Sequence, residues 1–133
     1  MTSIEINKLV GQKIGLHCWD FVRKIEADFY YRNLPPVIVD IHNGDEGRAL
    51  LADDEDAMCA RAGWVLVKRP KDGDICVMTR RKDDAAHVGV FLQVDGGGVI
   101  HTEIHKPVVF TLIKWLPSLG YLNCRYYRPK VSE

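Results

Sequence analysis

The chain has 133 residues, of which 47% are hydrophobic, and its 18 basic residues balance 18 acidic ones. This length predicts a single domain, residues 1–133, with a hydrophobic core of its own. The balanced charge gives no general reason to expect a nucleic acid or an anionic membrane as a partner, and no apolar run approaches the roughly 20 residues that a membrane-spanning helix needs.

Two further features exclude classes of protein. Residues 1–8 contain no basic segment followed by an apolar stretch, so we expect no secretory signal and a protein that stays in the cytosol or leaves it without one. The four cysteines, Cys18, Cys59, Cys76 and Cys124, are widely spaced. This spacing argues against a structural zinc site or a disulfide framework, so the default interpretation is four free thiols that pack as small hydrophobic residues.

The first third of the chain predicts helices. Residues 1–13 carry a short amphipathic pattern that Gly11 ends, and residues 18–31 carry the clearest helical period of the sequence. The apolar face of the second helix is made by residues that step by four, three and four: Cys18, Val22, Ile25 and Phe29. Cys18 therefore lies on the stripe that faces the core, at the positive end of the helix, where N-terminal amides favour a thiolate and burial opposes it.

Residues 37–62 are predicted to be an insertion between the helices and a sheet. Residues 37–52 predict a short strand and a loop, and residues 53–62 predict a helix that Gly63 closes. We interpret the charged run at residues 80–82 as solvated surface.

From Trp64 onward the hydrophobic period changes to two, which predicts strands. The predicted strands are residues 64–67, 75–78, 87–94, 99–103, 108–113 and 121–127. The layout of helices first and then five or six meandering antiparallel strands predicts an α+β domain.

His87 and His101 lie on adjacent predicted strands. A hairpin centred on residues 95–98 pairs residues whose numbers add up to about 193, which places His87 nearly opposite residue 106 and His101 near Leu92. A bulge at the glycines of the turn would change this register. The two histidines are therefore expected on neighbouring strands, where they could share a face.

Cys18, His87 and His101 could form a catalytic triad. A cysteine nucleophile needs a base that takes its proton, and the base needs a third polar group that fixes its tautomer. The alternative interpretation is structural: a cysteine on the buried stripe of a helix usually belongs to the core, and a histidine at the start of a strand is usually a satisfied polar residue. Spacing alone leaves both interpretations open.

Other candidate sites carry weaker signals. A metal-binding face made by His101, Glu103 and His105 is conceivable from strand parity, but it lacks cysteine or helix ligands. His42 is interpreted as a loop residue, and the glycines at 96–98 open no helix that could bind a phosphate.

Four motifs occur in an order that is similar to that of the NlpC family of papain-like cell-wall cysteine peptidases. They are Cys18-Trp19-Asp20-Phe21-Val22-Arg23, Asp72-Gly73-Asp74-Ile75, His87-Val88-Gly89-Val90-Phe91 and Val99-Ile100-His101-Thr102. Together with Leu9-Val10-Gly11, the Cys-Trp pair most resembles the branch found in phage tail proteins. The resemblance covers residues 9–103 and implies a papain-like NlpC-type fold, in which a helix bearing the cysteine packs on a five- or six-stranded antiparallel sheet.

The resemblance implies a role for each candidate residue. Cys18 would be the nucleophile, His87 the general base and His101 the residue that orients the base. Residues 1–17 contain no tyrosine, which many members use in the oxyanion hole. The backbone N–H of Cys18 is therefore one expected oxyanion donor, with His17 as a candidate for the second.

The implied function is hydrolysis of a peptide bond in the peptidoglycan stem by a cysteine peptidase or amidase, without a metal or an organic cofactor. The expected partners are the stem peptide and other phage tail proteins, with no nucleic acid or membrane. We expect the protein in the host cytoplasm before assembly and then in the virion tail. The alternative is a structural or assembly module of a phage tail that keeps the hydrolase fold with little or no catalysis.

Overall fold

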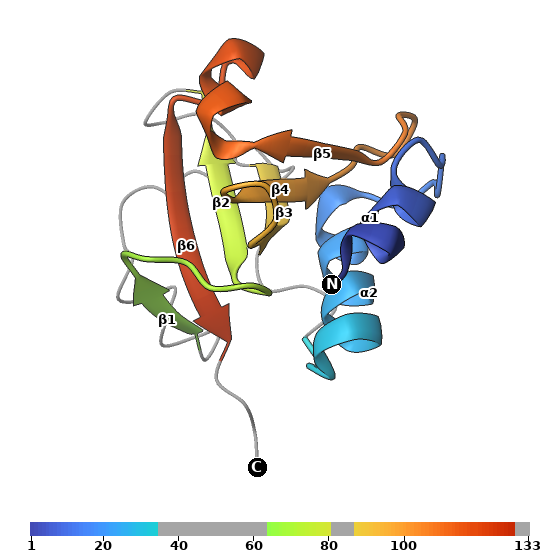
Figure 1. Cartoon of the computed structure of the whole chain (residues 1–133), viewed down its shortest axis with the longest axis horizontal. Coiled ribbons are helices and arrows are strands. Elements are labelled where there is room, and N and C mark those ends of the chain that lie inside the picture. The colour runs from blue at the N-terminus through green and yellow to red at the C-terminus, as the bar shows by residue number, and fades with distance from the viewer. Residues whose placement is uncertain (35–63, 81–86, 130–133) are drawn as a thin grey trace.

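The computed structural model of the protein describes residues 1–34, 64–80 and 87–129. These residues form a small α+β domain with three helices and one open antiparallel sheet of six strands (Figure 1). The predicted α+β class and antiparallel sheet of five or six strands are therefore confirmed. The elements predicted within residues 37–62 lie outside the described residues. No helix in the described ranges is long and apolar enough to cross a membrane.

The two N-terminal helices follow from local signals. Helix α1 (Ser3–Leu9) begins with a capping box, in which the Thr2 side chain accepts a hydrogen bond from the Glu5 N–H and the Glu5 carboxylate accepts one from the Thr2 N–H. Helix α2 (Cys18–Tyr30) ends where Tyr31 adopts a left-handed backbone with φ of 56°. The helical period of the sequence thus predicts α2 to within one residue.

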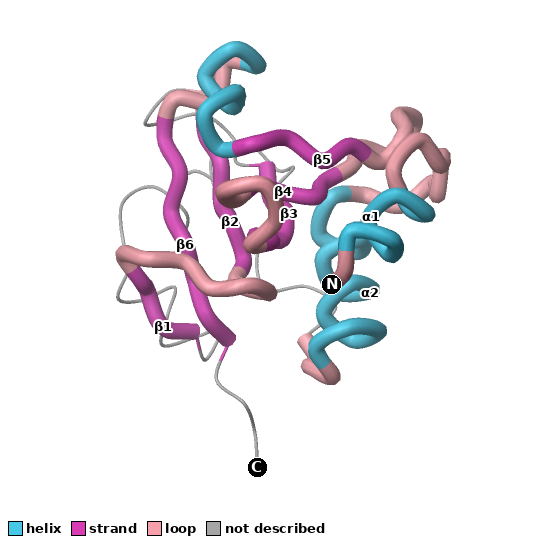
Figure 2. The backbone as a smooth tube through the Cα atoms, in the orientation of Figure 1, coloured by secondary structure: helices cyan, strands magenta, loops and turns pink. Residues whose placement is uncertain are grey.

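The strand positions agree with the prediction better than their order does. The strands are β1 (Trp64–Val67), β2 (Ile75–Thr79), β3 (His87–Leu92), β4 (Gly98–His101), β5 (Val109–Leu112) and β6 (Asn123–Pro129). The expected meander is found only from β2 to β5, because β6 crosses back and pairs with both β1 and β2 (Figure 2). Alternation of apolar residues marks a strand but does not identify its neighbour, so the meander predicted for the whole sheet is wrong.

The alternation within β2 divides the core between the two faces of the sheet. Ile75 and Val77 belong to the cluster that packs against α2. Cys76 and Met78 belong to a second cluster with Leu116 of the 3₁₀-helix η2 (Ile113–Leu119). Helix α2 therefore covers one face of the sheet, and η2 covers part of the other.

The hairpin of β3 and β4 has a different register from the predicted one. Gly98 pairs with Leu92 as the first residue of β4 and does not belong to the turn. The same register, continued along the strands, places His101 opposite Gly89 and not near Leu92. The turn is short because residues 95–97 all adopt positive φ, with values of 54°, 90° and 107°, which two glycines and an aspartate tolerate.

Gly89 lets β3 and β4 approach each other closely. A Cβ atom at this position would lie 2.4 Å from Cγ1 of Val99 and 2.7 Å from the carbonyl oxygen of Ile100. Both distances are too short for any residue with a side chain. The His-Val-Gly pattern therefore has a structural reason, since the glycine makes room for the strand that carries His101.

The C-terminal end of α2 is tied to the sheet by buried ionic groups. Arg32 Nη1 donates to Glu26 Oε2 at 3.1 Å and to the carbonyl oxygen of Gly73 at 2.8 Å. On the sheet side, Arg128 binds both carboxylate oxygens of Asp74, at 3.0 and 2.8 Å. Glu26 and Asp74 are both fully buried. Arg32 therefore joins the C-terminal end of α2 to the turn before β2.

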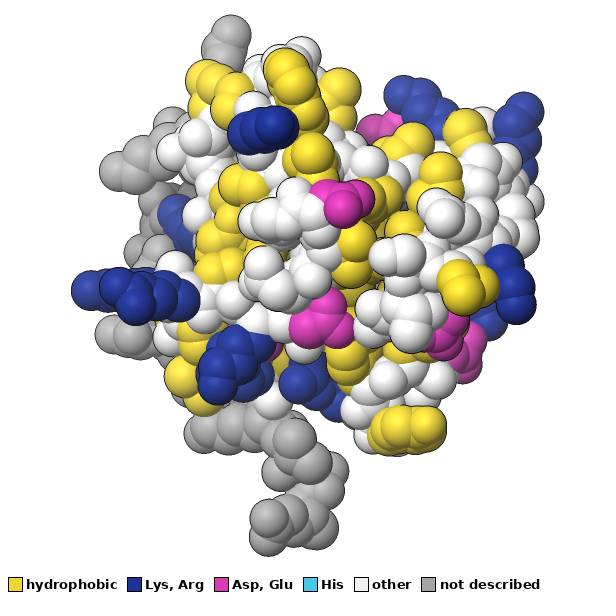
Figure 3. Space-filling view, viewed as in Figure 1, with side chains coloured by type: hydrophobic (Ala, Val, Ile, Leu, Met, Phe, Trp, Pro, Cys, Tyr) yellow, Lys and Arg dark blue, Asp and Glu magenta, His cyan; other side chains and the backbone are white. Residues whose placement is uncertain are grey.

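The surface carries charges of both signs together with hydrophobic side chains around η2 (Figure 3). The exposed large hydrophobic residues of this region are Val109, Trp115, Leu119 and Leu122. Two of them, Val109 and Leu119, also line the pocket described below.

Candidate active site

Cys18 is the first residue of α2, and its side chain is only 1% exposed. Burial raises the pKa of the thiol to about 11, while hydrogen bonds from the backbone N–H groups of Val88 and Trp19 act in the opposite direction. The thiol is therefore protonated near pH 7, and a base must take its proton before it can act as a nucleophile.

The hydrogen bond from Val88 places the sulfur atom of Cys18 at the beginning of β3. Val88 directly follows His87, the first residue of this strand. The side chains of Val88 and Val90 pack in the cluster that contains Cys18, whereas strand alternation points His87 toward the other face. The thiol thus lies one residue along the backbone from the predicted base, at the end of the sheet.

The structure brings His87 and His101 into direct contact. Nε2 of His87 lies 2.9 Å from Nδ1 of His101. The register of the hairpin makes the two residues diagonal neighbours on one face of the sheet. The prediction that they share a face is therefore confirmed, although the predicted register was wrong by three residues.

His101 is held as a neutral imidazole. It is 6% exposed, and burial lowers its pKa to about 4, with Glu103 acting in the opposite direction. Its second ring nitrogen, Nε2, lies 3.1 Å from the hydroxyl of Thr111 on β5. If this nitrogen donates to Thr111, Nδ1 of His101 is an acceptor, and Nε2 of His87 must be the donor of the bond between the rings. The remaining nitrogen of a neutral His87, Nδ1, is then a proton acceptor.

Tyr121 and Arg80 extend this arrangement outward from His87. The Tyr121 ring stacks on the His87 ring, with centroids 5.6 Å apart and an angle of 14° between the planes. The guanidinium of Arg80 lies over the Tyr121 ring, 5.3 Å from its centroid. The sequence did not single out Tyr121 or Thr111. Strand parity could have identified Thr111, since it lies two residues from Val109, which pairs with His101.

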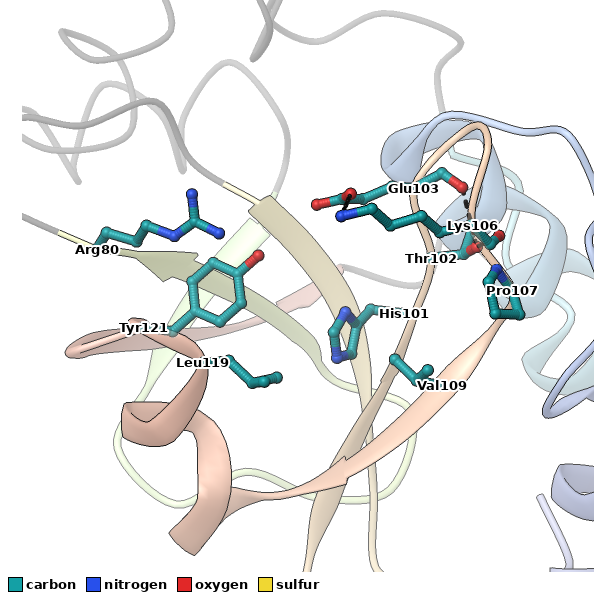
Figure 4. A pocket seen from close by; sticks show the side chains of 9 residues that line it. All are labelled: Arg80, His101, Thr102, Glu103, Lys106, Pro107, Val109, Leu119 and Tyr121. Atoms are coloured by element: carbon teal, nitrogen blue, oxygen red, sulfur yellow. Dashed lines mark hydrogen bonds and ion pairs between the residues drawn. The ribbon is translucent and has the colours of Figure 1, made fainter.

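A pocket of about 320 Å³ opens beside His101 (Figure 4). Its polar lining includes Arg80, Glu103, Lys106 and Tyr121, and Figure 4 shows Arg80 and Tyr121 across the pocket from the other two. Its apolar lining is made by Pro107, Val109 and Leu119. The charge of Glu103, in the lining of this pocket, also contributes to the raised pKa of the Cys18 thiol. The pocket is therefore lined by His101 and by Tyr121, whose ring stacks on His87.

His17, the candidate oxyanion donor, is the N-cap residue of α2. Its side chain is exposed and makes no capping hydrogen bond, and its carbonyl oxygen accepts the N–H of Phe21 at 3.0 Å. The backbone N–H groups of Cys18 and Trp19 both hydrogen-bond to the thiol sulfur. The start of α2 therefore directs two amides toward the sulfur atom, which favours its thiolate form.

The remaining candidates do not form a second site in the described residues. Cys76 is buried on β2 and hydrogen-bonds with Cys124 on β6, so these thiols belong to the core as predicted. Cys59 and His42 lie outside the described residues. Residues 1–34, 64–80 and 87–129 contain no group of three or more His, Cys, Asp or Glu side chains that could hold a metal ion, and His105 is exposed.

The chain was compared with known proteins in three ways. No family model matches it, no curated protein is significantly similar to it, and no solved structure matches its fold significantly. The resemblance to the NlpC family thus stays a prediction that rests on the four motifs and their order.

Proposed function

We propose that this protein is an NlpC-type cysteine peptidase or amidase that hydrolyses a peptide bond in the peptidoglycan stem, as a component of a phage tail. The observation that carries the proposal is the hydrogen-bonded chain from His87 through His101 to Thr111, which begins one residue from the backbone N–H that contacts the thiol of Cys18. Amide hydrolysis by a cysteine nucleophile needs a base next to the thiol and a second group that orients this base. Here the cysteine also lies at a helix N-terminus.

The proposed reaction has two steps. Nδ1 of His87 takes the thiol proton while the sulfur of Cys18 attacks the carbonyl carbon of the scissile amide. The C–N bond then breaks, and His87 returns the proton to the leaving amine, which yields a thioester. Water hydrolyses the thioester, adding its hydroxyl group to the acyl carbon and its proton to the sulfur.

His101 supports both steps as a positioning residue. Because its own pKa is about 4, it stays neutral while His87 changes charge. The backbone N–H groups at the start of α2 stabilise the oxyanion that forms on the carbonyl oxygen.

The test is incubation of the protein with purified muropeptides, followed by identification of new amino termini. We expect cleavage by the native chain and none by the Cys18→Ala variant, with unchanged thermal unfolding. Cys76→Ala is the matched control, because it removes another buried thiol that does not line the pocket. Cleavage that survives Cys18→Ala would overturn the proposal.

A second candidate is a tail assembly module that keeps this fold without catalysis. The observation that favours it is the burial of Cys18, whose side chain is 1% exposed and whose pKa is about 11. Labelling with iodoacetamide near pH 7 separates the two candidates. A catalytic Cys18 reacts faster than the other three cysteines, because His87 generates the thiolate, whereas an inert Cys18 reacts no faster than buried Cys76.

A further inference from the structure

We propose that Cys76 and Cys124 form a redox-active pair, which a small disulfide such as glutathione disulfide converts into a disulfide bond between β2 and β6. In the structure both thiols are free. The bond would join two strands that are neighbours in the sheet but distant in the sequence. This modification site is separate from the proposed active site and does not depend on the proposed function.

The register of the sheet brings the two thiols together. Met78 on β2 pairs directly with Cys124 on β6. Cys76 lies two residues before Met78, so it is the diagonal neighbour of Cys124 on the same face of the sheet. The two side chains also hydrogen-bond to each other. An oxidant that reacts with one sulfur atom therefore finds the second one beside it.

The surroundings give the two thiols different roles. Cys76 is fully buried in the cluster that contains Met78 and Leu116, whereas Cys124 is partly exposed at the edge of this cluster. The hydrogen bond from Cys76 lowers the pKa of Cys124, and the same bond together with burial raises the pKa of Cys76. Cys124 is therefore the thiol that reacts first with a dissolved oxidant, and Cys76 is the thiol that resolves the product.

The third cysteine of the described ranges lies on the other side of the sheet. Cys18 packs in the cluster that contains Val77. Neighbouring residues of a strand point to opposite faces, so Val77 and Cys76 face away from each other. Strand β2 therefore separates Cys18 from the pair, and oxidation of the pair does not consume the proposed nucleophile.

The oxidation consists of two thiol–disulfide exchanges. The thiolate of Cys124 attacks one sulfur of glutathione disulfide, which forms a mixed disulfide and releases one glutathione thiolate. Cys76 then loses its proton to solvent, and its sulfur attacks the Cys124 sulfur, which forms the protein disulfide and releases the second glutathione thiolate. The two glutathione thiolates take up the two protons that the cysteines have lost. Two cysteine thiols are thus oxidised, and one glutathione disulfide is reduced.

The bond would tie β6 into the sheet. Strand β6 reaches its place between β1 and β2 by crossing back from the far end of the chain. A covalent link between distant segments lowers the entropy of the unfolded chain, so it stabilises the folded state. The oxidised chain should therefore unfold at a temperature roughly 5–10 °C higher than the reduced chain.

The test is oxidation of the full native chain with glutathione disulfide, followed by alkylation of the remaining thiols, trypsin digestion and mass spectrometry. Trypsin places the four cysteines in different peptides, which are residues 14–23, 49–61, 72–80 and 115–125. We expect the link between peptides 72–80 and 115–125 to exceed any other link by about tenfold, because contact in the folded chain raises the effective concentration of these thiols. The preference should disappear in concentrated urea.

Two variants separate the roles of the thiols. Cys76→Ala should retain a glutathione adduct on Cys124, because the thiol that resolves the adduct is missing. Cys124→Ala should form neither the link nor an adduct on buried Cys76, and it should lose the rise in unfolding temperature. Cys18→Ala is the matched control and should form the link as the native chain does.

Three results would overturn the inference: an adduct on Cys124 of the native chain that never resolves, a dominant link to another cysteine, or no reaction at either thiol. A linked chain that unfolds at the same temperature as the reduced chain would overturn the stabilising role of the bond. Muropeptide cleavage enters none of these measurements, so failure of the proposed function and failure of this inference are distinguishable.

Discussion

Buried ionisable groups lie near both ends of α2. The protein stabilises these groups in a different way at each end. At the N-terminal end Cys18 and His101 are neutral at pH 7, because burial raises the pKa of the first and lowers that of the second. At the C-terminal end the charge of Asp74 is paired with Arg128 through two hydrogen bonds.

This difference separates a site for chemistry from a structural tie. In the proposed mechanism the thiol of Cys18 passes its proton to His87, while His101 stays neutral. A buried carboxylate that is paired with a guanidinium is a structural contact, and removal of either partner leaves a charge without compensation. The predictions below test whether the two ends of α2 behave in these different ways.

The largest expected effect comes from His101→Ala. It removes the acceptor of the His87 Nε2–H, so the tautomer of the base is no longer fixed and kcat for muropeptide cleavage should fall by about 10²–10⁴-fold. The free energy of unfolding, measured in urea, should change much less than the activity. An equal loss in Arg128→Gln would show that the effect is structural and not specific to the base.

Arg128→Gln should produce the reverse pattern. It leaves the buried carboxylate of Asp74 without its partner and should lower the free energy of unfolding by about 3 kcal/mol, as determined by urea denaturation. Lys24→Gln is the control, since it breaks an exposed ion pair with Asp28 at 2.9 Å and should cost less than about 0.5 kcal/mol. Similar costs for the two variants would contradict the structural role of the Asp74–Arg128 pair.

Glu26 should make stability depend on pH. Burial raises its pKa from 4.5 to about 7, with Arg32 acting in the opposite direction. The folded state therefore binds a proton that the unfolded state has lost between these values, so this stabilising contribution is complete below pH 4.5 and is lost as pH rises through about 7. The loss should reach about 3 kcal/mol.

The measurement for Glu26 is urea unfolding at several pH values between 4 and 8, compared with Glu26→Gln. Because the amide does not titrate, the difference in stability between the two proteins should itself vary across this range. A constant difference would show that Glu26 has an ordinary pKa in the folded protein.

The smallest expected effect is that of Thr111→Val, which removes the hydroxyl at 3.1 Å from Nε2 of His101. Loss of one neutral hydrogen bond corresponds to about 1 kcal/mol, so cleavage should slow about fivefold. Thr111→Ser keeps the hydroxyl and should retain most of the activity. If both variants are equally impaired, the methyl group and not the hydroxyl supports His101.

The parts of the fold that depend on local pattern could be predicted from the sequence. The helical stripe that begins at Cys18 gave α2, and strand parity placed His87 and His101 on one face. The same stripe contained a further signal that was missed, since Glu26 lies four residues after Val22 and so faces the core.

The parts of the fold that depend on contacts between distant segments of the chain could not be predicted. Nothing in the alternation of residues 121–127 indicates that β6 lies between β1 and β2. Arg80 is exposed, as predicted for the charged run, but its contact with Tyr121 joins segments far apart in the sequence and could not be predicted. The register of the hairpin also depended on the backbone angles of the turn and not on its composition.

That short turn between β3 and β4 makes the protein unusually sensitive to changes in loop length. Insertion of one residue at positions 95–97 would move the side chain of His101 to the opposite face wherever β4 shifts its register to keep the turn length. Homologous chains should therefore tolerate substitutions in this turn far better than insertions or deletions.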